Sequence, residues 1–201
     1  MKLNSGDLLL VRQEYQKRLV LPPVDRIPKK QFFVCPVGLV GAGKSTVMRP
    51  LSAILSLVRI SSDEIREILK ERDVGYEQLM EIERPLAEEV AMQGFSIAFD
   101  ADCGNPKTKE MVLKLAEKVT AKVLWIHINP PEDFILNKLR TYSHTWLFKN
   151  DGEAVENYYR QKQKRLEEKT RFNFLTSIDA SRSDLADQIT HAASLIAKEL
   201  A

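Results

Sequence analysis

The chain has 201 residues, a length that fits a single domain. Hydrophobic residues make up 44% and charged residues 29% of it, which is ordinary for a folded protein and excludes the disordered class. The formal net charge is +2, from 30 Lys and Arg against 28 Asp and Glu, and this balance argues against a partner such as nucleic acid or an anionic membrane.

The cysteine content and the apolar runs predict the compartment. Cys35 and Cys103 are too few for a disulfide framework or a metal cluster, so we expect free thiols in a reducing environment. The longest uninterrupted apolar run near the N-terminus, Leu8 to Val11, is too short for a signal peptide or a membrane span. We therefore expect a cytoplasmic protein with no membrane partner.

Residues 1–30 differ from the rest of the chain. A short helix around Asp7 to Leu19 is followed by Leu21-Pro22-Pro23 and then by Pro28. Because the residue before a proline avoids the α region, this second part is expected to be extended and to lie on the surface. We interpret residues 1–30 as an N-terminal arm that precedes one domain over residues 31–201.

Short apolar runs alternate with longer amphipathic runs after residue 31. This alternation predicts βαβ units and an α/β fold, in which a parallel sheet is covered by helices on both faces. Pro50 is expected to bend the first of these helices, and Gly94 to end the third. The expected strands are 32–37, 58–61, 95–99, 123–128 and 174–178, and the expected helices are 44–57, 63–71, 76–93, 106–119, 131–142, 153–170 and 182–200.

The turn after the first strand matches the phosphate-loop or Walker A pattern G-x-x-x-x-G-K-[ST]. Glycines allow the backbone N–H groups to surround phosphate oxygens, and the following helix points its positive end at the same anion. We expect Lys44 to reach the β- and γ-phosphates of ATP and the Ser45 hydroxyl to bind Mg²⁺. The predicted nucleotide-binding residues are Gly38, Gly41, Ala42, Gly43, Lys44, Ser45 and Thr46.

An acidic and a basic residue follow the second strand in Ser61-Ser62-Asp63-Glu64-Ile65-Arg66. On a helix, Asp63 and Arg66 lie on one face, where they are able to accept the proton of a hydroxyl and to hold its carrier. A structural interpretation competes, because Ser61-x-x-Glu64 is a capping box and the helix dipole favours acids in a first turn. The position at the carboxyl end of a strand favours the functional interpretation.

The order of G-L-V-G-A-G-K-S-T, S-S-D-E-I-R and F-S-I-A-F-D-A-D resembles the zeta-toxin and polynucleotide-kinase-like group of P-loop kinases, over about residues 31–200. The resemblance implies a P-loop NTPase three-layer sandwich with an adenylate-kinase-like order of five parallel strands and a helical lid. It also implies that Asp63 is the general base and that Arg66 holds the acceptor.

The third strand ends at Asp100, where a carboxylate can orient Mg²⁺ directly or through water. The alternative is an Asp that only ends the strand and begins a turn. Related kinases tend to continue D-A-T-N, whereas this chain continues to Asp102, a second acidic candidate. An Arg that related kinases often carry further on is replaced by Lys107 or Lys109.

Residues 138–171 are the expected lid, which closes over the transferring phosphoryl group. Its candidate cations are Arg140, Arg160 and Arg165, and Arg140 is the first choice because it follows the fourth strand and its helix. A solvated charged face is the alternative for most of them. His144 and Trp146 are interpreted as lid-packing residues in preference to stacking on a base or sugar, and His127 as a hydrogen-bonded core residue.

The sequence therefore predicts an ATP- and Mg²⁺-dependent kinase that moves the γ-phosphoryl group to a hydroxyl of a small-molecule or nucleotide-like acceptor. Two alternatives stay open. A 5′-hydroxyl polynucleotide kinase would need a basic channel with stacking aromatics, for which the net charge offers little. A non-catalytic ATP-binding switch would consume ATP independently of an acceptor. A GTPase is disfavoured because Asn137-Lys138 is followed by Leu139-Arg140 and so lacks the N-K-x-D motif.

Overall fold

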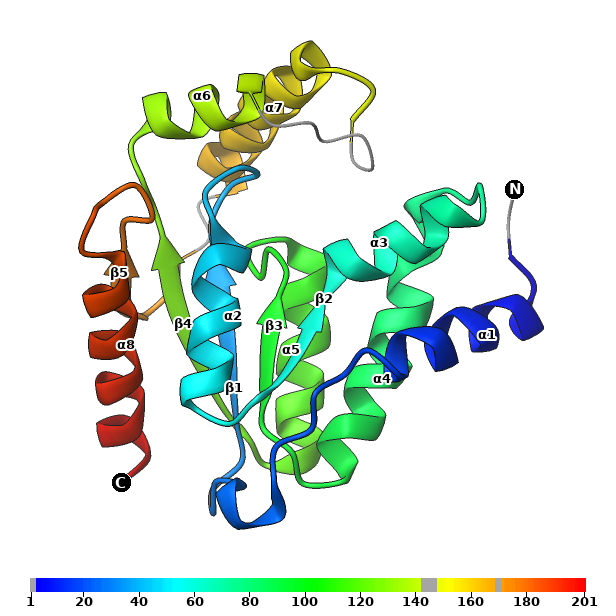
Figure 1. Cartoon of the computed structure of the whole chain (residues 1–201), viewed down its shortest axis with the longest axis vertical. Coiled ribbons are helices and arrows are strands. Elements are labelled where there is room, and N and C mark those ends of the chain that lie inside the picture. Colours follow the sequence, from blue (N-terminus) through cyan, green and yellow to red (C-terminus); the bar gives the residue numbers. More distant parts are fainter. Residues whose placement is uncertain (1–2, 142–147, 169–170) are drawn as a thin grey trace.

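Strands and helices alternate along the chain in a computed structural model that describes residues 3–141, 148–168 and 171–201 (Figure 1). The elements are α1 (Ser5–Gln16), η1 (Val24–Arg26), β1 (Phe32–Val37), α2 (Lys44–Ile54), β2 (Val58–Ser61), α3 (Ser62–Glu71), η2 (Tyr76–Gln78), α4 (Leu79–Met92), β3 (Ile97–Asp100), α5 (Pro106–Val119), β4 (Lys122–Ile128), α6 (Glu132–Thr141), α7 (Asp151–Glu168), β5 (Phe174–Ile178) and α8 (Leu185–Leu200).

The strands form one five-stranded sheet in the order β2-β3-β1-β4-β5. All four pairings are parallel, and β1 runs in register with β4 from Phe32 opposite Lys122 to Val37 opposite His127. The predicted α/β fold with a parallel sheet is confirmed. Because the strands are parallel, their carboxyl ends and the loops that follow β1, β2 and β3 meet at one edge of the sheet.

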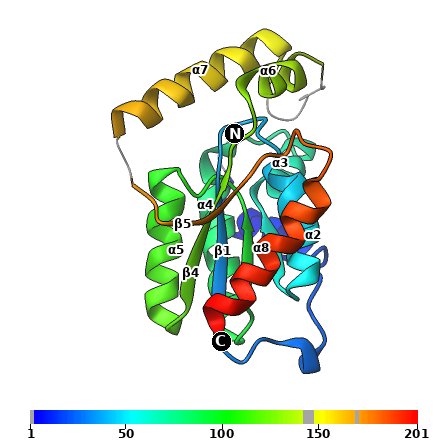
Figure 2. The same ribbon diagram turned by 90° about the vertical axis from the view of Figure 1, so that its left-hand side faces the viewer.

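Helices cover both faces of the sheet, as the alternation of elements predicts. α2 and α8 pack on one face, and α4 and α5 on the other (Figures 1 and 2). Strand β1 is buried along its whole length. Phe33 and Cys35 belong to the core cluster on the side of α4 and α5, whereas Phe32 and Val34 belong to the cluster formed with α2 and α8. The phosphate loop therefore follows the central strand of the sheet.

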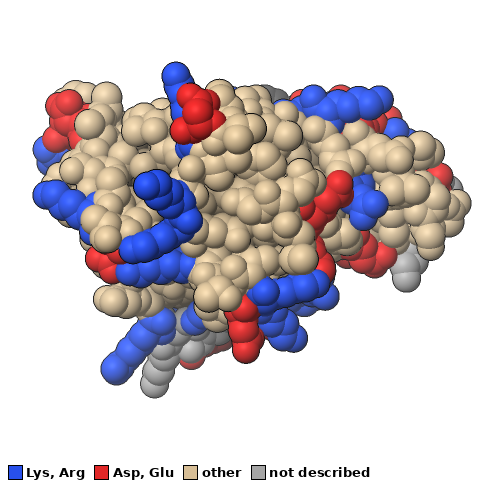
Figure 3. All heavy atoms as spheres, turned by 90° about the horizontal axis from the view of Figure 1, so that it is seen from below, with Lys and Arg blue, Asp and Glu red and all other residues tan. Residues whose placement is uncertain are grey.

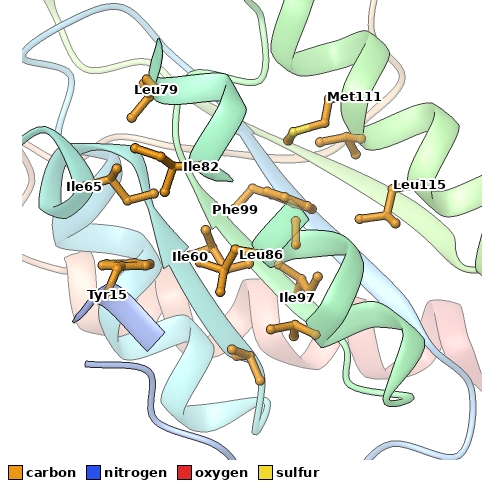
Figure 4. Packing of buried hydrophobic residues seen from close by; sticks show 14 of the residues in the cluster. Tyr15, Ile60, Ile65, Leu79, Ile82, Leu86, Ile97, Phe99, Met111 and Leu115 are labelled. Atoms are coloured by element: carbon orange, nitrogen blue, oxygen red, sulfur yellow. The ribbon is translucent and has the colours of Figure 1, made fainter. Parts of the chain in front are cut away.

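The N-terminal helix α1 contributes to the core. It packs against α3 and α4, and the side chains of Val11 and Tyr15 are fully buried. Asn4 caps the helix by accepting hydrogen bonds from the backbone N–H groups of residues 6 and 7. Tyr15 lies near Ile60 and Ile65 in this cluster (Figure 4). The first 30 residues thus include an element that is packed against the domain.

Two helices stand above the carboxyl edge of the sheet, α6 and α7, and they contact each other (Figure 2). The segment that joins them falls partly outside the described residues, and the predictions for His144 and Trp146 lie there. None of the helices in the described ranges is both long enough and apolar enough to cross a bilayer. On the face shown in Figure 3, at the opposite edge of the sheet, basic and acidic side chains are interspersed.

Candidate active site

The turn between β1 and α2 has a backbone that requires glycine. Gly41 and Gly43 have positive φ angles of 80° and 92°, a region that side chains with a Cβ rarely adopt. A Cβ on Gly38 would lie 2.6 Å from the carbonyl oxygen of Ile128, and one on Gly43 would lie 2.8 Å from the Cβ of Ala180. All three glycines are thus required by the local geometry, and they leave the loop's backbone open to a phosphate group.

Lys44, the first residue of α2, folds back over the loop. Its Nζ donates hydrogen bonds of 2.9 Å to the carbonyl oxygens of both Gly38 and Leu39. The ammonium group is therefore held at the start of the loop, where its positive charge adds to that of the α2 N-terminus. This is the location at which the sequence predicts contact with the β- and γ-phosphates.

Ser45 and Asp100 meet at the carboxyl ends of β1 and β3. The Ser45 hydroxyl donates a 2.9 Å hydrogen bond to Oδ1 of Asp100, a side chain that is only 1% exposed. Burial raises the pKa of this carboxyl, while Arg59 and the Ser45 hydroxyl oppose the increase. Nη1 of Arg59 donates to Oδ2 of Asp100 at 2.5 Å and so favours the charged form.

These two residues fit the way proteins bind Mg²⁺ beside a nucleotide. Such an ion takes one or two protein oxygens and completes its octahedron with phosphate oxygens and water. In the part of the chain that the structure describes, no group of three or more His, Cys, Asp or Glu gathers into a closed metal cage. The Ser45 hydroxyl and the Asp100 carboxylate are the oxygens that would hold Mg²⁺ here.

Asp63 and Arg66 project from the first turns of α3, at the end of β2. Nη1 of Arg66 lies 2.5 Å from Oδ1 of Asp63, and the two side chains are 27% and 36% exposed. They are therefore within reach of a molecule in solvent. The pair lies on the β3 side of the phosphate loop, because β2 and β3 precede β1 in the order of the sheet.

The expected capping box at the start of α3 is only half formed. The Ser61 side chain accepts a 3.4 Å hydrogen bond from the N–H of Glu64, as an N-cap does. The return bond is absent among the described contacts, because the N–H of Ser61 donates to the hydroxyl of Tyr15 at 2.7 Å. Ser61 alone caps the helix, so Asp63 is left without a capping role.

A group of residues that the sequence did not indicate connects these two parts of the site. Arg59 bridges the carboxylates of Asp100 and Glu64, and Arg49 also contacts Glu64 at 3.4 Å. The one available signal was a charged residue inside an apolar strand, Val58-Arg59-Ile60. Glu64 was interpreted only as a capping residue, and its pairing with Arg59 corrects that interpretation.

Glu83 on α4 is a buried carboxyl below the start of α3. It is 1% exposed, and Oε2 accepts a 2.8 Å hydrogen bond from the Ser62 hydroxyl. Its Oε1 has no hydrogen-bond partner within the described residues. Burial raises the pKa of Glu83, and Asp63 and Asp100 add to the increase although Arg66 opposes it. The charged form is therefore costly in the folded protein.

This burial predicts how the stability depends on pH. Between the unfolded pKa of Glu83 and its raised folded pKa, the folded protein binds more protons, so stability falls as the pH rises through that window. We expect Glu83→Gln to unfold with less pH dependence and to gain about 1–3 kcal/mol over the parent protein near pH 8, well above the pKa of the unfolded carboxyl. Urea unfolding between pH 4.5 and 8 measures this. The control is Glu81→Gln, on the exposed side of the same helix, which should leave the pH dependence of stability unchanged. If the free energy of unfolding changed with pH equally in Glu83→Gln and in the parent protein, the expectation would be contradicted.

Asp102 fastens the loop after β3 to its neighbours. Its Oδ1 accepts hydrogen bonds from the backbone N–H groups of Gly104 at 3.0 Å and Gly38 at 3.4 Å. Its Oδ2 is paired with Arg165 of α7. Of the three arginines predicted as lid cations, Arg165 is the one placed beside the phosphate loop, whereas Arg140 and Arg160 are exposed.

A pocket of about 340 Å³ opens between the phosphate loop and α7. His127, at the end of β4, lines it and stacks on Phe174 with ring centroids 4.6 Å apart. Burial and the nearby Arg165 lower the pKa of His127. The expectation of a core histidine is thus corrected, since the ring borders a pocket. The pocket lies on the β4 side of β1, across the loop from the α3 pair.

Comparisons with known proteins show which family and fold the chain shares. A family model described as AAA domain matches residues 34–168, whereas no curated protein matches the chain. A structure from the PezAT chromosomal toxin–antitoxin system of Streptococcus pneumoniae is 14% identical with a TM-score of 0.61, covering 99% of this chain and 97% of that one.

Two solved kinases share the fold as well. The Mycobacterium tuberculosis APS kinase CysC, in complex with AMPPNP and APS, is 17% identical with a TM-score of 0.54 over 84% of this chain and 99% of its own. Shikimate kinase from Bacteroides thetaiotaomicron is 18% identical with a TM-score of 0.54 over 84% and 98%. At these identities the likeness shows the fold, which is that of the small P-loop kinases.

Proposed function

The chain belongs to the family described as AAA domain, and from this premise we propose that it is an ATP-dependent kinase acting on a hydroxyl of a small-molecule or nucleotide-like acceptor. One observation carries the proposal. A phosphate loop with its lysine, a hydroxyl–carboxylate pair suited to Mg²⁺ and an accessible acid–base pair meet at the carboxyl edge of one parallel sheet.

The phosphate loop would bind the triphosphate. The loop amides and Lys44 would contact its oxygens, and Ser45 with Asp100 would hold Mg²⁺. Bound Mg²⁺ would neutralise charge that builds up on the phosphate oxygens. Loop, lysine and helix end are preorganised, so they favour the negative charge of the transition state without reorganising.

Asp63 and Arg66 would act on the acceptor. The acceptor oxygen forms a bond to the γ-phosphorus, the bond from that phosphorus to the departing ADP oxygen breaks, and Asp63 takes the hydroxyl proton. Arg66, held 2.5 Å from Asp63, would position the acceptor. No covalent enzyme intermediate is needed.

Residues 138–171 would serve as the lid over this reaction. Arg165 is our preferred lid cation, because it already lies beside Asp102 and the loop that follows β3. Arg140, the first choice from the sequence, is exposed on α6.

An acceptor screen tests the proposal. We expect the protein to consume Mg·ATP slowly alone and at least about 10²-fold faster with the correct acceptor, since a positioned hydroxyl gains the contribution of the general base. Nucleosides, nucleotide sugars, amino sugars, antibiotics and oligonucleotide 5′ ends are the acceptor classes to compare by ADP release. Stimulation only by oligonucleotides would favour the polynucleotide kinase. Turnover that no acceptor changes would favour an ATP-binding switch.

A further inference from the structure

The hydroxyl of Tyr15 reaches from the N-terminal helix to the start of α3. The ring is fully buried in the core cluster, near Ile60 and Ile65 (Figure 4). The phenol oxygen accepts a 2.7 Å hydrogen bond from the N–H of Ser61 and donates its own proton to Glu64 at 3.4 Å. Burial raises the pKa of Tyr15. The hydroxyl therefore stays protonated and able to donate at any working pH.

From Glu64 the contacts continue to the Mg²⁺-binding side of the site. Arg59 pairs with Glu64 through one nitrogen, and its other terminal nitrogen donates to Asp100 at 2.5 Å. Asp100 in turn accepts the hydroxyl of Ser45. An unbroken series of polar contacts thus joins a helix before the phosphate-loop domain to the carboxylate suited to Mg²⁺.

We propose that Tyr15 is a positioning residue, which sets the start of α3 and, through Glu64 and Arg59, the orientation of the Asp100 carboxylate. The part of this inference that concerns phosphoryl transfer rests on the proposed function. The part that concerns α3 and the carboxylate rests on the contacts alone.

The physical reason lies in what the hydroxyl satisfies. Ser61 is 2% exposed, so its N–H has no access to water, and leaving such a group unpaired is costly. Loss of the hydroxyl would loosen the first turn of α3, which carries Asp63 and leads directly to Arg66 in the second turn. Glu64 would keep its arginine partners but lose the contact that fixes its position against the core.

A simpler role is that the Tyr15 ring only fills space between α1 and β2. Tyr15→Phe separates the two roles, because phenylalanine keeps the ring and removes the hydroxyl alone. Val11→Ala is the matched control. Val11 is buried in the same helix and the same cluster, so its truncation weakens the packing of α1 without touching the polar contacts.

Two measurements on the full chain decide between these roles. Hydrogen exchange, followed in peptides that span residues 59–66, reports the start of α3 without any ligand. Calorimetric titration of ATP at increasing Mg²⁺ reports the metal-binding carboxylate. In Tyr15→Phe we expect exchange at Ser61 to be about 5- to 30-fold faster. We also expect tight ATP binding to need about 10-fold more Mg²⁺. This is the low end of the loss in metal affinity seen when a residue that hydrogen-bonds a metal ligand is removed.

Val11→Ala should show neither change once both variants are compared at equal distance below their melting temperatures. Unchanged exchange at residues 59–66 in Tyr15→Phe, or an equal change in Val11→Ala, would overturn the inference. Faster exchange with an unchanged Mg²⁺ requirement would overturn the link to Asp100. If the parent protein failed to bind ATP, the proposed function would fall, and the exchange data would still decide whether Tyr15 holds α3.

Discussion

We expect Asp63→Asn to slow phosphoryl transfer about 10²- to 10⁴-fold while the affinity for Mg·ATP stays that of the parent protein. This corresponds to a loss of about 3–5 kcal/mol of transition-state stabilisation. The reason is that an amide keeps the shape of the carboxylate but does not accept the proton of the acceptor. Asp63 pairs with Arg66, whereas Ser45 pairs with Asp100, so we expect the contacts that bind the nucleotide to persist in the variant. The charge of Asp63 raises the pKa of Asp100, and its removal therefore favours the charged form of that carboxylate.

The structure sharpens this test. Ser61 caps α3, so the substitution should not weaken the start of the helix. Glu110→Gln is the matched control, because Glu110 also pairs with a basic residue of its own helix, Lys114 at 2.7 Å, on the exposed surface of α5. Turnover with the identified acceptor and a direct ATP titration measure the two effects. Parent-like turnover in Asp63→Asn would show that the residue is structural, and weakened ATP binding would place it among the nucleotide contacts.

Local patterns in the sequence were sufficient to predict the elements and the fold class. The bounds of β1, β2 and β5 agree with the predicted strands at 32–37, 58–61 and 174–178. β1 is a continuous buried apolar segment, as expected of a central parallel strand, whereas β2 contains Arg59 and β5, at the edge of the sheet, is mostly half-buried. Among the strands, the main difference is at β3, which was expected at 95–99 but begins at Ile97 and extends to Asp100. Phe95 and Ser96 lead into the strand, and the Ser96 hydroxyl accepts the N–H of Phe32.

The motifs located the phosphate loop and the α3 pair because their residues are close in the sequence. The contacts between them were not predictable in this way. Tyr15 lies 46 residues before Ser61, and Arg59 lies 41 residues before Asp100, so only the packing of α1 and β2 brings these groups together. A single sequence contains no pattern that pairs side chains over such separations.

The same reasoning applies to the lid. Arg140 was preferred because it follows β4 and its helix, which is an argument from chain order. The path of α7 brings Arg165 to Asp102, beside the loop after β3. The catalytic role of Arg140 stays a prediction. Helix periodicity predicts which face of α7 is buried, but it does not predict the direction in which the helix crosses the sheet.

The second large effect is expected for Lys44→Ala, which should lower acceptor-dependent turnover of Mg·ATP about 10²- to 10³-fold, as removal of a preorganised charge-stabilising donor does. Within the described residues the Lys44 side chain pairs with no carboxylate, and its Nζ donates to the backbone carbonyls of Gly38 and Leu39. Removing it takes one positive charge from the phosphate loop and leaves the glycine backbone that shapes the loop. We therefore expect the melting temperature to stay near that of the parent protein.

The control is Lys114→Ala, which removes the same charge from a surface position that is 74% exposed. It should bind ATP and turn it over as the parent protein does. ADP release and calorimetric ATP titration of both variants measure the result. If Lys44→Ala turned over ATP at the parent rate, the assignment of the phosphate loop would be wrong, because this lysine is the cation that the loop motif places against the β- and γ-phosphates. The expected results are slow turnover in both Lys44→Ala and Asp63→Asn, with the fold intact in each and with ATP affinity retained in Asp63→Asn. Together they would separate the nucleotide side of the site from its acceptor side.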